Sequence, residues 1–149
     1  QEKNLRPGTE AMPLIAAFGA AVSALPDLCA EKERVGALAG RLRLRLTEFP
    51  GVALNSPENG LPYIVNFSTC SVRSETMLHF LASKGIYVSS GSACSKAKPS
   101  HVLTAMELSR ERIQSSLRVS FSRYNTEEDV DCLAEALREG MSCIAKRPF

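Results

Sequence analysis

Residues 85 to 95 read Gly-Ile-Tyr-Val-Ser-Ser-Gly-Ser-Ala-Cys-Ser. A short apolar run from Ile86 to Val88 changes abruptly to small side chains that end at Cys94. Small residues let the backbone pass close to a ligand, so the pattern predicts a strand that leads into a loop presenting Cys94. The alternative is that Cys94 is one more small buried side chain, which is common for free cysteine.

The composition predicts one ordinary globular domain. The chain has 149 residues, of which 44% are hydrophobic and 23% charged, and its net charge is +2. Such a balance does not favour a polyanionic partner, so nucleic acid is not expected. No uninterrupted apolar run reaches the roughly 18 residues of a membrane-spanning helix, so no membrane partner is expected and a cytoplasmic location is the default.

The cysteines and histidines do not have the spacing of a metal site. No Cys-x-x-Cys pair is present, and His79 and His101 lie far apart in the sequence. Zinc sites in proteins usually combine such pairs, so we expect a reduced chain without metal. The five cysteines are Cys29, Cys70, Cys94, Cys132 and Cys143.

Two helices are expected in the first third of the chain. Pro13 suits a first helical turn, and apolar residues then recur at helical spacing as far as Leu25, where Pro26 ends the pattern. A second amphipathic helix runs from Leu28 to Leu46. Arginines at positions 41, 43 and 45 could suggest a phosphate or RNA site, but charges spaced around a helix usually form a solvated face, which we prefer.

The remaining chain alternates short strands with helices. Gly85 is expected to end one helix in the left-handed conformation, and Thr126 with Asp129 resembles a capping box at the start of the last one. The pattern predicts an α/β or α+β sandwich with a small, mostly antiparallel sheet and helices on one face. The expected strands cover residues 52–54, 63–67, 86–88 and 117–121, and the expected helices begin near residues 71–73, 101 and 127.

Several motifs resemble the cysteine desulfurases of the NifS/IscS type, which are pyridoxal-phosphate enzymes of the class-V aminotransferase superfamily. The most specific are the small-residue run into Cys94 and the serine-rich approach to Arg118, and the resemblance extends over essentially the whole chain. The other matching stretches are residues 6–10, 13–14, 99–103 and 126–128. The resemblance implies the fold of the C-terminal domain of fold-type I pyridoxal-phosphate transferases.

The resemblance also implies roles for three residues. Cys94 would take the sulfur of L-cysteine as a persulfide, leaving L-alanine, and Arg118 would bind the substrate carboxylate. Thr9 would reach the cofactor phosphate across a homodimer interface, with Arg6 as a weaker candidate. A planar guanidinium grips a carboxylate through two parallel hydrogen bonds, which suits Arg118. The implied partners are a sulfur-acceptor protein or an iron-sulfur scaffold.

Part of the family pattern has no counterpart in this sequence. The family binds pyridoxal phosphate through a lysine that follows a histidine, and neither His79 nor His101 precedes a lysine. We therefore interpret residues 1–13 as the end of a large cofactor-binding domain and residues 14–149 as the small C-terminal domain, and we expect this chain alone to bind no cofactor. The opening at Gln1 without a methionine suggests a fragment.

Two further positions depart from the family. Glu107 and Ser122 stand where glycine is frequent, which puts the local turns in doubt more than the function. Three hypotheses remain open: part of a cysteine desulfurase, a non-catalytic remnant that dimerises or binds a partner, and a cofactor-free persulfide carrier.

Overall fold

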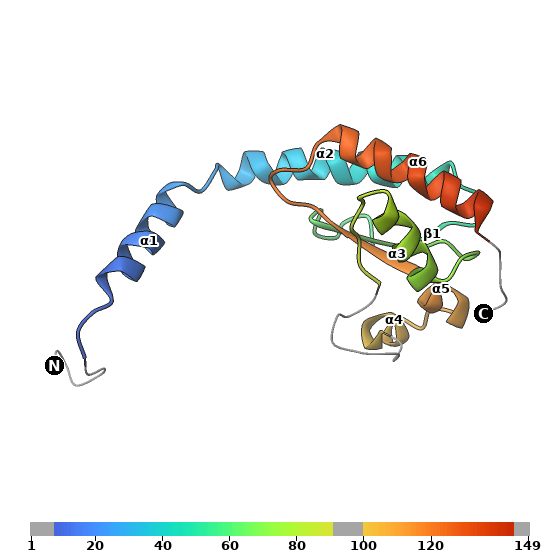
Figure 1. The fold of residues 1–149 in the computed structure, drawn as a ribbon, viewed down its shortest axis with the longest axis horizontal. Coiled ribbons are helices and arrows are strands. Elements are labelled where there is room, and N and C mark those ends of the chain that lie inside the picture. Colours follow the sequence, from blue (N-terminus) through green and yellow to red (C-terminus); the bar gives the residue numbers. More distant parts are fainter. Residues whose placement is uncertain (1–7, 91–99, 145–149) are drawn as a thin grey trace. The chain divides into compact units, whose positions relative to one another are not determined.

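The computed structural model describes residues 8–90 and 100–144, which belong to two compact units divided between Glu31 and Lys32. Figure 1 shows the elements along the chain. The helices are α1 (Met12–Ser23), α2 (Leu28–Thr47), α3 (Ser74–Ser83), α4 (His101–Ala105), α5 (Arg110–Gln114) and α6 (Glu127–Cys143), and the strands are β1 (Ala53–Leu54), β2 (Ile64–Ser68) and β3 (Ser116–Ser120).

The first unit contains α1 and the start of α2. A proline lies in the first turn of α1, and the Asp27 carboxylate caps α2 by accepting hydrogen bonds from the backbone of Cys29 at 2.8 Å and Ala30 at 3.2 Å. Both predicted helices are therefore confirmed. In α1 no residue is buried, and Phe18 is 72% exposed.

Among the described residues, no single helix is both long and apolar enough to cross a membrane. Helices α1 and α2 pass such a test only as a pair that is bent by 65°, and they do so on length and composition alone.

The second unit is built on an antiparallel sheet with the strand order β1-β2-β3. Because side chains alternate along a strand, Val65, Phe67, Leu117 and Val119 all lie on one face, where they are buried. Asn66 and Arg118 lie on the other face as directly opposed partners. The predicted antiparallel sheet is confirmed, and its two faces differ sharply in polarity.

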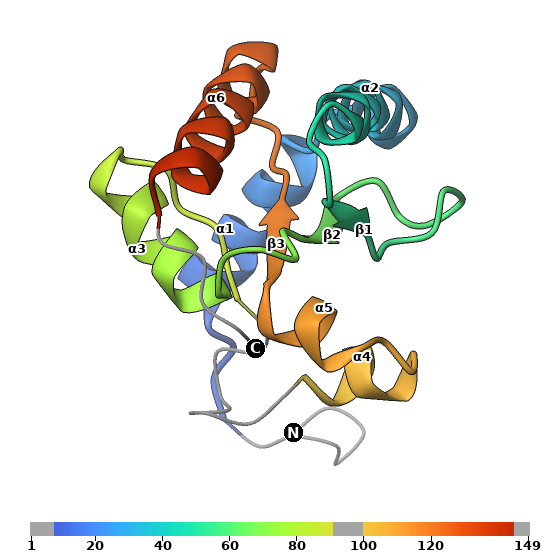
Figure 2. The same ribbon diagram turned by 90° about the vertical axis from the view of Figure 1, so that its right-hand side faces the viewer.

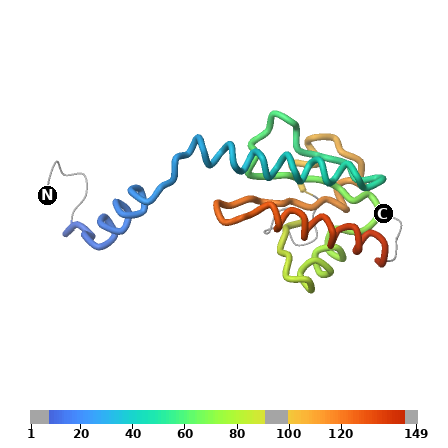
Figure 3. The backbone as a smooth tube through the Cα atoms, turned by 90° about the horizontal axis from the view of Figure 1, so that it is seen from above, coloured from blue at the N-terminus to red at the C-terminus, as the bar shows by residue number. Residues whose placement is uncertain are grey.

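Helices α2, α3 and α6 cover the apolar face of the sheet (Figure 2). Helix α6 starts with the predicted capping box, in which the Thr126 and Asp129 side chains each accept a hydrogen bond from the other's backbone. Helices α2 and α6 run alongside each other (Figure 3), joined by Arg41, which contacts Glu127 at 2.9 Å and Asp131. The arginines of α2 therefore connect elements within the fold. Arg43 does so by donating hydrogen bonds to the backbone carbonyls of Ser56 and Pro57.

One prediction about the remaining elements was wrong, and one helix was missed. Residues 86–88 do not form a strand, and only Ser89 pairs with β3, through a bridge to Arg118. Helix α5 was not expected; Ser109 caps it by accepting a hydrogen bond from the backbone of Arg112, which stabilises its first turn. Helices α4 and α5 lie on the side of the sheet opposite α2 and α6 (Figure 2), so helices cover part of the second face as well.

Candidate functional site

Three polar residues form a row across the sheet on the face opposite the core. Arg118 on β3 is opposite Asn66 on β2 and, on its other side, opposite Ser89. The backbone of Arg118 is hydrogen-bonded to Ser89, with the Arg118 amide donating at 2.7 Å and the Ser89 amide at 3.1 Å. Asn66 and Arg118 are therefore a pair without mutual backbone hydrogen bonds, the type in which facing side chains approach most closely.

Arg118 lines a cavity of about 300 Å³ together with Asn55, Asn66 and residues of α4, including His101. The Arg118 Nε is buried, and no acceptor in residues 8–90 and 100–144 lies at hydrogen-bond distance from it. A buried donor without an acceptor is costly, so this nitrogen is a candidate group for binding a ligand. A carboxylate matches it best, because one edge of a guanidinium offers two parallel N–H groups to two oxygens.

The sequence could not identify Asn66 as part of this cavity. Only part of the information is local: the alternation of side chains along β2 places Asn66 on the polar face, between the buried Val65 and Phe67. Its partner across the sheet depends on the register with β3, which lies far along the chain. Arg112 was also missed, because it contacts Asn55 only through the unexpected helix α5.

The other predicted site residues are not brought together with Arg118. Cys94 lies outside the described residues, although Ser89, which pairs with Arg118, precedes it by five positions in the chain. Thr9 belongs to the N-terminal unit, where it is exposed. The roles expected for Cys94 and Thr9 stay predictions.

The described cysteines differ in their exposure to solvent. Burial raises the pKa of the Cys70 thiol, with a smaller contribution from Glu111, so this thiol stays protonated at neutral pH. Cys29, Cys132 and Cys143 are exposed. In the part of the chain that the structure describes, no group of three or more histidine, cysteine or acidic side chains could hold a metal ion.

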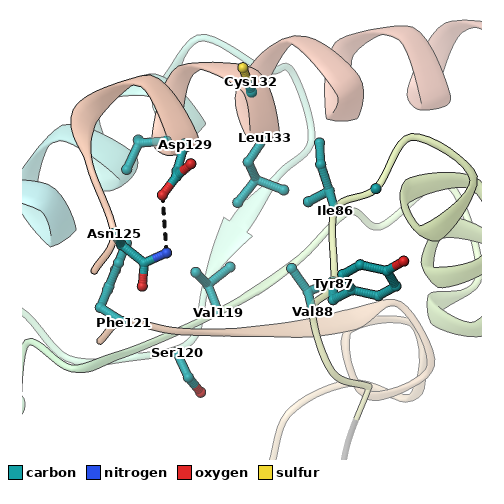
Figure 4. Close-up of a pocket in the computed structure, with 12 residues that line it drawn as sticks. Ile86, Tyr87, Val88, Val119, Ser120, Phe121, Asn125, Asp129, Cys132 and Leu133 are labelled. Atoms are coloured by element: carbon teal, nitrogen blue, oxygen red, sulfur yellow. Dashed lines mark hydrogen bonds between the residues drawn. The ribbon is translucent and has the colours of Figure 1, made fainter. Parts of the chain in front are cut away.

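A second cavity of about 300 Å³ opens beside α6 (Figure 4). Its walls include the apolar residues Ile86, Val88 and Leu133. Two polar residues of the wall, Asn125 and Asp129, already form a hydrogen bond with each other, in which Asn125 Nδ2 donates to Asp129 Oδ2 at 3.1 Å. Cys132, an exposed cysteine, is also among the residues that line this cavity. The cavity at Arg118 is therefore the stronger candidate for a functional site.

The sheet, its helical layer and the cavity lined by Arg118 define an α/β domain. The class-V aminotransferase family model matches residues 1–133, and this chain belongs to that family. It is 40% identical over 144 residues to a cysteine desulfurase IscS of Clostridium botulinum (strain Hall), covering 92% of this chain and 36% of the relative. It is 41% identical over 143 residues to a cysteine desulfurase IscS of Methanosarcina thermophila, covering 93% and 35%.

Solved structures of NifS-like proteins also match this chain. A NifS-like protein matches with a TM-score of 0.75 and 31% identity, over 97% of this chain and 37% of that protein. A NifS-like protein of Rickettsia africae matches with a TM-score of 0.75 and 32% identity, over 97% and 38%. The resemblance to the NifS/IscS type is confirmed, and the chain spans little more than a third of the length of these relatives.

Proposed function

We propose that this chain is the C-terminal part of a cysteine desulfurase. In the net reaction L-cysteine and the Cys94 thiol give L-alanine and a Cys94 persulfide, whose terminal sulfur then passes to an acceptor protein. The observation that carries the proposal is that Arg118 lines a cavity of about 300 Å³ and that its buried Nε has no hydrogen-bond partner among the described residues. The relatives named cysteine desulfurase supply the reaction class.

Arg118 binds the α-carboxylate of the substrate in this proposal. Its strand position is fixed from both sides, by the β2 register and by the hydrogen bonds to Ser89. A guanidinium held in this way offers two donors at a fixed angle, which orients the amino acid as well as attracting it. The reacting sulfur then lies at a defined place relative to β3.

Cys94 accepts the sulfur. It follows the Ser89 bridge closely in the sequence, so the chain that carries it starts next to the carboxylate site. A thiolate is the form that attacks sulfur, and an attacking thiol works best when its pKa is near the ambient pH. An acceptor protein and a homodimer, with Thr9 at the cofactor phosphate, belong to the same proposal.

The described residues do not fit pyridoxal phosphate. The family cofactor is held by a lysine, and neither described lysine lines the Arg118 cavity. Lys84 is paired with Glu139 at 2.6 Å at the end of α3, and Lys32 lies on α2. The described part of the chain therefore offers a carboxylate site without an anchor for the cofactor.

The test uses the gene product that carries these residues, supplied with pyridoxal phosphate and L-cysteine. We expect equal amounts of L-alanine and transferred sulfur, and a mass increase of one sulfur atom on the peptide that contains Cys94. The variant Cys94→Ser should form neither, while Cys132→Ser, an exposed cysteine elsewhere, should behave as the parent protein. Undiminished turnover in Cys94→Ser would contradict the proposal, and absence of a lysine-bound cofactor absorbance would favour the non-catalytic remnant.

A further inference from the structure

We propose that Asn66 is a second binding residue for the substrate carboxylate, donating a hydrogen bond from Nδ2 beside the Arg118 guanidinium. The inference rests on the proposed function, since it concerns the same ligand group. The sequence motifs did not indicate Asn66. Its side-chain amide is oriented by a hydrogen-bond network that includes Arg112 and Asn55.

Arg112 fixes the orientation of the first amide in this network. Its Nε donates to Asn55 Oδ1 at 3.0 Å, and its Nη2 donates to the Leu54 carbonyl at 2.7 Å. A guanidinium can only donate, so the group of Asn55 that faces it must be the oxygen. The Nδ2 group of Asn55 therefore points the other way.

Asn55 in turn fixes the orientation of Asn66. Its Nδ2 donates to Asn66 Oδ1 at 2.7 Å and to the Ser68 hydroxyl at 2.8 Å, which uses both of its N–H bonds. Asn66 thus presents its oxygen to the network and has its Nδ2 left over. Among residues 8–90 and 100–144, no acceptor takes a hydrogen bond from this Nδ2.

The free amide and the free guanidinium nitrogen serve the same cavity. Asn66 and Arg118 are directly opposed on neighbouring strands, on the same face, and both line the cavity of about 300 Å³. A carboxylate has two oxygens with about four acceptor positions, so a bidentate arginine leaves positions for a further donor. The facing amide is placed to fill one of them.

Burial of the network makes this donor rigid. Asn55 is 7% exposed and Ser68 is fully buried, and the Ser68 hydroxyl itself donates to the Arg112 carbonyl at 2.7 Å. A binding group whose supporting hydrogen bonds are already made loses little freedom when the ligand arrives. Arg112 and Asn55 are therefore positioning residues that act through Asn66.

The test observes both donors directly by NMR of the ¹⁵N-labelled chain. The probe is L-alanine, the product, and ethylamine is the matched compound without a carboxylate. We expect the Arg118 Nε–H and Asn66 Nδ2–H₂ resonances to shift together, with one dissociation constant, on addition of L-alanine but not of ethylamine. The variant Asn66→Asp keeps the oxygen facing Asn55 and replaces the donor by a negative charge, so affinity should fall at least tenfold.

A control and a second variant make the result decisive. Asn59→Asp introduces the same charge at an exposed turn residue and should bind L-alanine as the parent chain does. Asn66→Ala removes the donor without adding charge and should weaken binding about three- to tenfold; in the complete gene product it should raise KM for L-cysteine more than it lowers kcat. Dispersed amide resonances in each variant show that it is folded.

Two outcomes would overturn the inference, and they are distinguishable. If the Arg118 resonance responds to L-alanine while Asn66 does not, and Asn66→Asp binds like Asn59→Asp, the second donor is wrong and the proposed function stands. If neither group responds, the proposed function loses its carboxylate site and the inference is wrong with it.

Discussion

The two faces of the three-stranded sheet use the same strands for different purposes. On the face under α2, α3 and α6, the strand residues are buried and apolar, and Phe67 is 1% exposed. On the other face, the residue next to it, Asn66, belongs to a polar row with Arg118 and Ser89. Because successive side chains along a strand point to opposite faces, a residue of the apolar core and a residue of the polar row are neighbours in the sequence. A substitution can therefore be aimed at one face of the sheet and not at the other.

The largest effect is expected on the apolar face. Phe67→Ala should lower the free energy of unfolding by about 3 to 5 kcal/mol, because it removes a buried ring and leaves a cavity. Urea unfolding measured by circular dichroism gives this value. Ile64→Ala, on the same strand but 43% exposed, is the matched control and should cost about 1 kcal/mol or less. Equal costs at the two positions would contradict the division between the faces.

Two arginines on the polar face should respond in opposite ways. Arg112→Met should lower the free energy of unfolding by about 3 kcal/mol, because it leaves the Asn55 oxygen and the Leu54 carbonyl without their donor. Arg118→Met should leave stability within about 0.5 kcal/mol or raise it, because its buried Nε already has no acceptor among the described residues. Parallel urea curves for the two variants measure the difference.

Under the proposed function, Arg118→Met should nevertheless abolish carboxylate binding. In the complete gene product, kcat/KM for L-cysteine should fall at least roughly a hundredfold, since a hydrogen-bonded charge pair contributes about 3 kcal/mol. Arg118→Lys keeps the charge but loses the parallel pair of N–H groups, so it should restore only part of this loss. An Arg118→Met protein that is destabilised and still active would mean that Arg118 belongs to the structural part of the face.

The sequence predicted the elements that depend on local patterns. The capping box at Thr126, the left-handed end of α3 at Gly85 and the strand expected over residues 63–67 are each contained within a few neighbouring residues, and all three are confirmed, the strand as β2. The family resemblance singled out Arg118 through its serine-rich approach; its role stays a prediction, to which the structure adds a cavity and an unpaired nitrogen.

The parts that were missed depend on contacts between distant residues. The network of Arg112, Asn55 and Asn66 joins a helix to two strands, and no local pattern gives the register between β2 and β3. Residues 86–88 have the composition of a strand, but pairing with β3 is limited to Ser89. Tertiary contacts decided these positions, which is the usual limit of strand propensity.

A smaller effect is expected at the helices that partly cover the polar face. Glu107, between α4 and α5, has a φ of 55°, in the left-handed region where a side chain is strained. Glu107→Gly should therefore raise the free energy of unfolding by about 0.5 to 1 kcal/mol, the strain relief being offset in part by the greater freedom of glycine in the unfolded chain. Glu107→Ala keeps the strain and should show no gain; an equal gain in both variants would contradict the explanation.

The smallest effect is expected at the exposed rim of the apolar face, where Arg41 joins α2 to α6. The hydrogen bond from Arg41 holds the pKa of Asp131 below its usual value. A carboxylate with a lowered folded-state pKa stabilises the fold above its unfolded pKa of about 4, and this contribution is lost as the pH falls through the folded-state value. Asp131→Asn should therefore unfold more easily than the parent chain at pH 7, with the difference disappearing under acid conditions and shrinking in high salt. Urea midpoints at pH 7 and pH 3 test this, and a difference that persists at the lower pH would mean that Asp131 acts by packing.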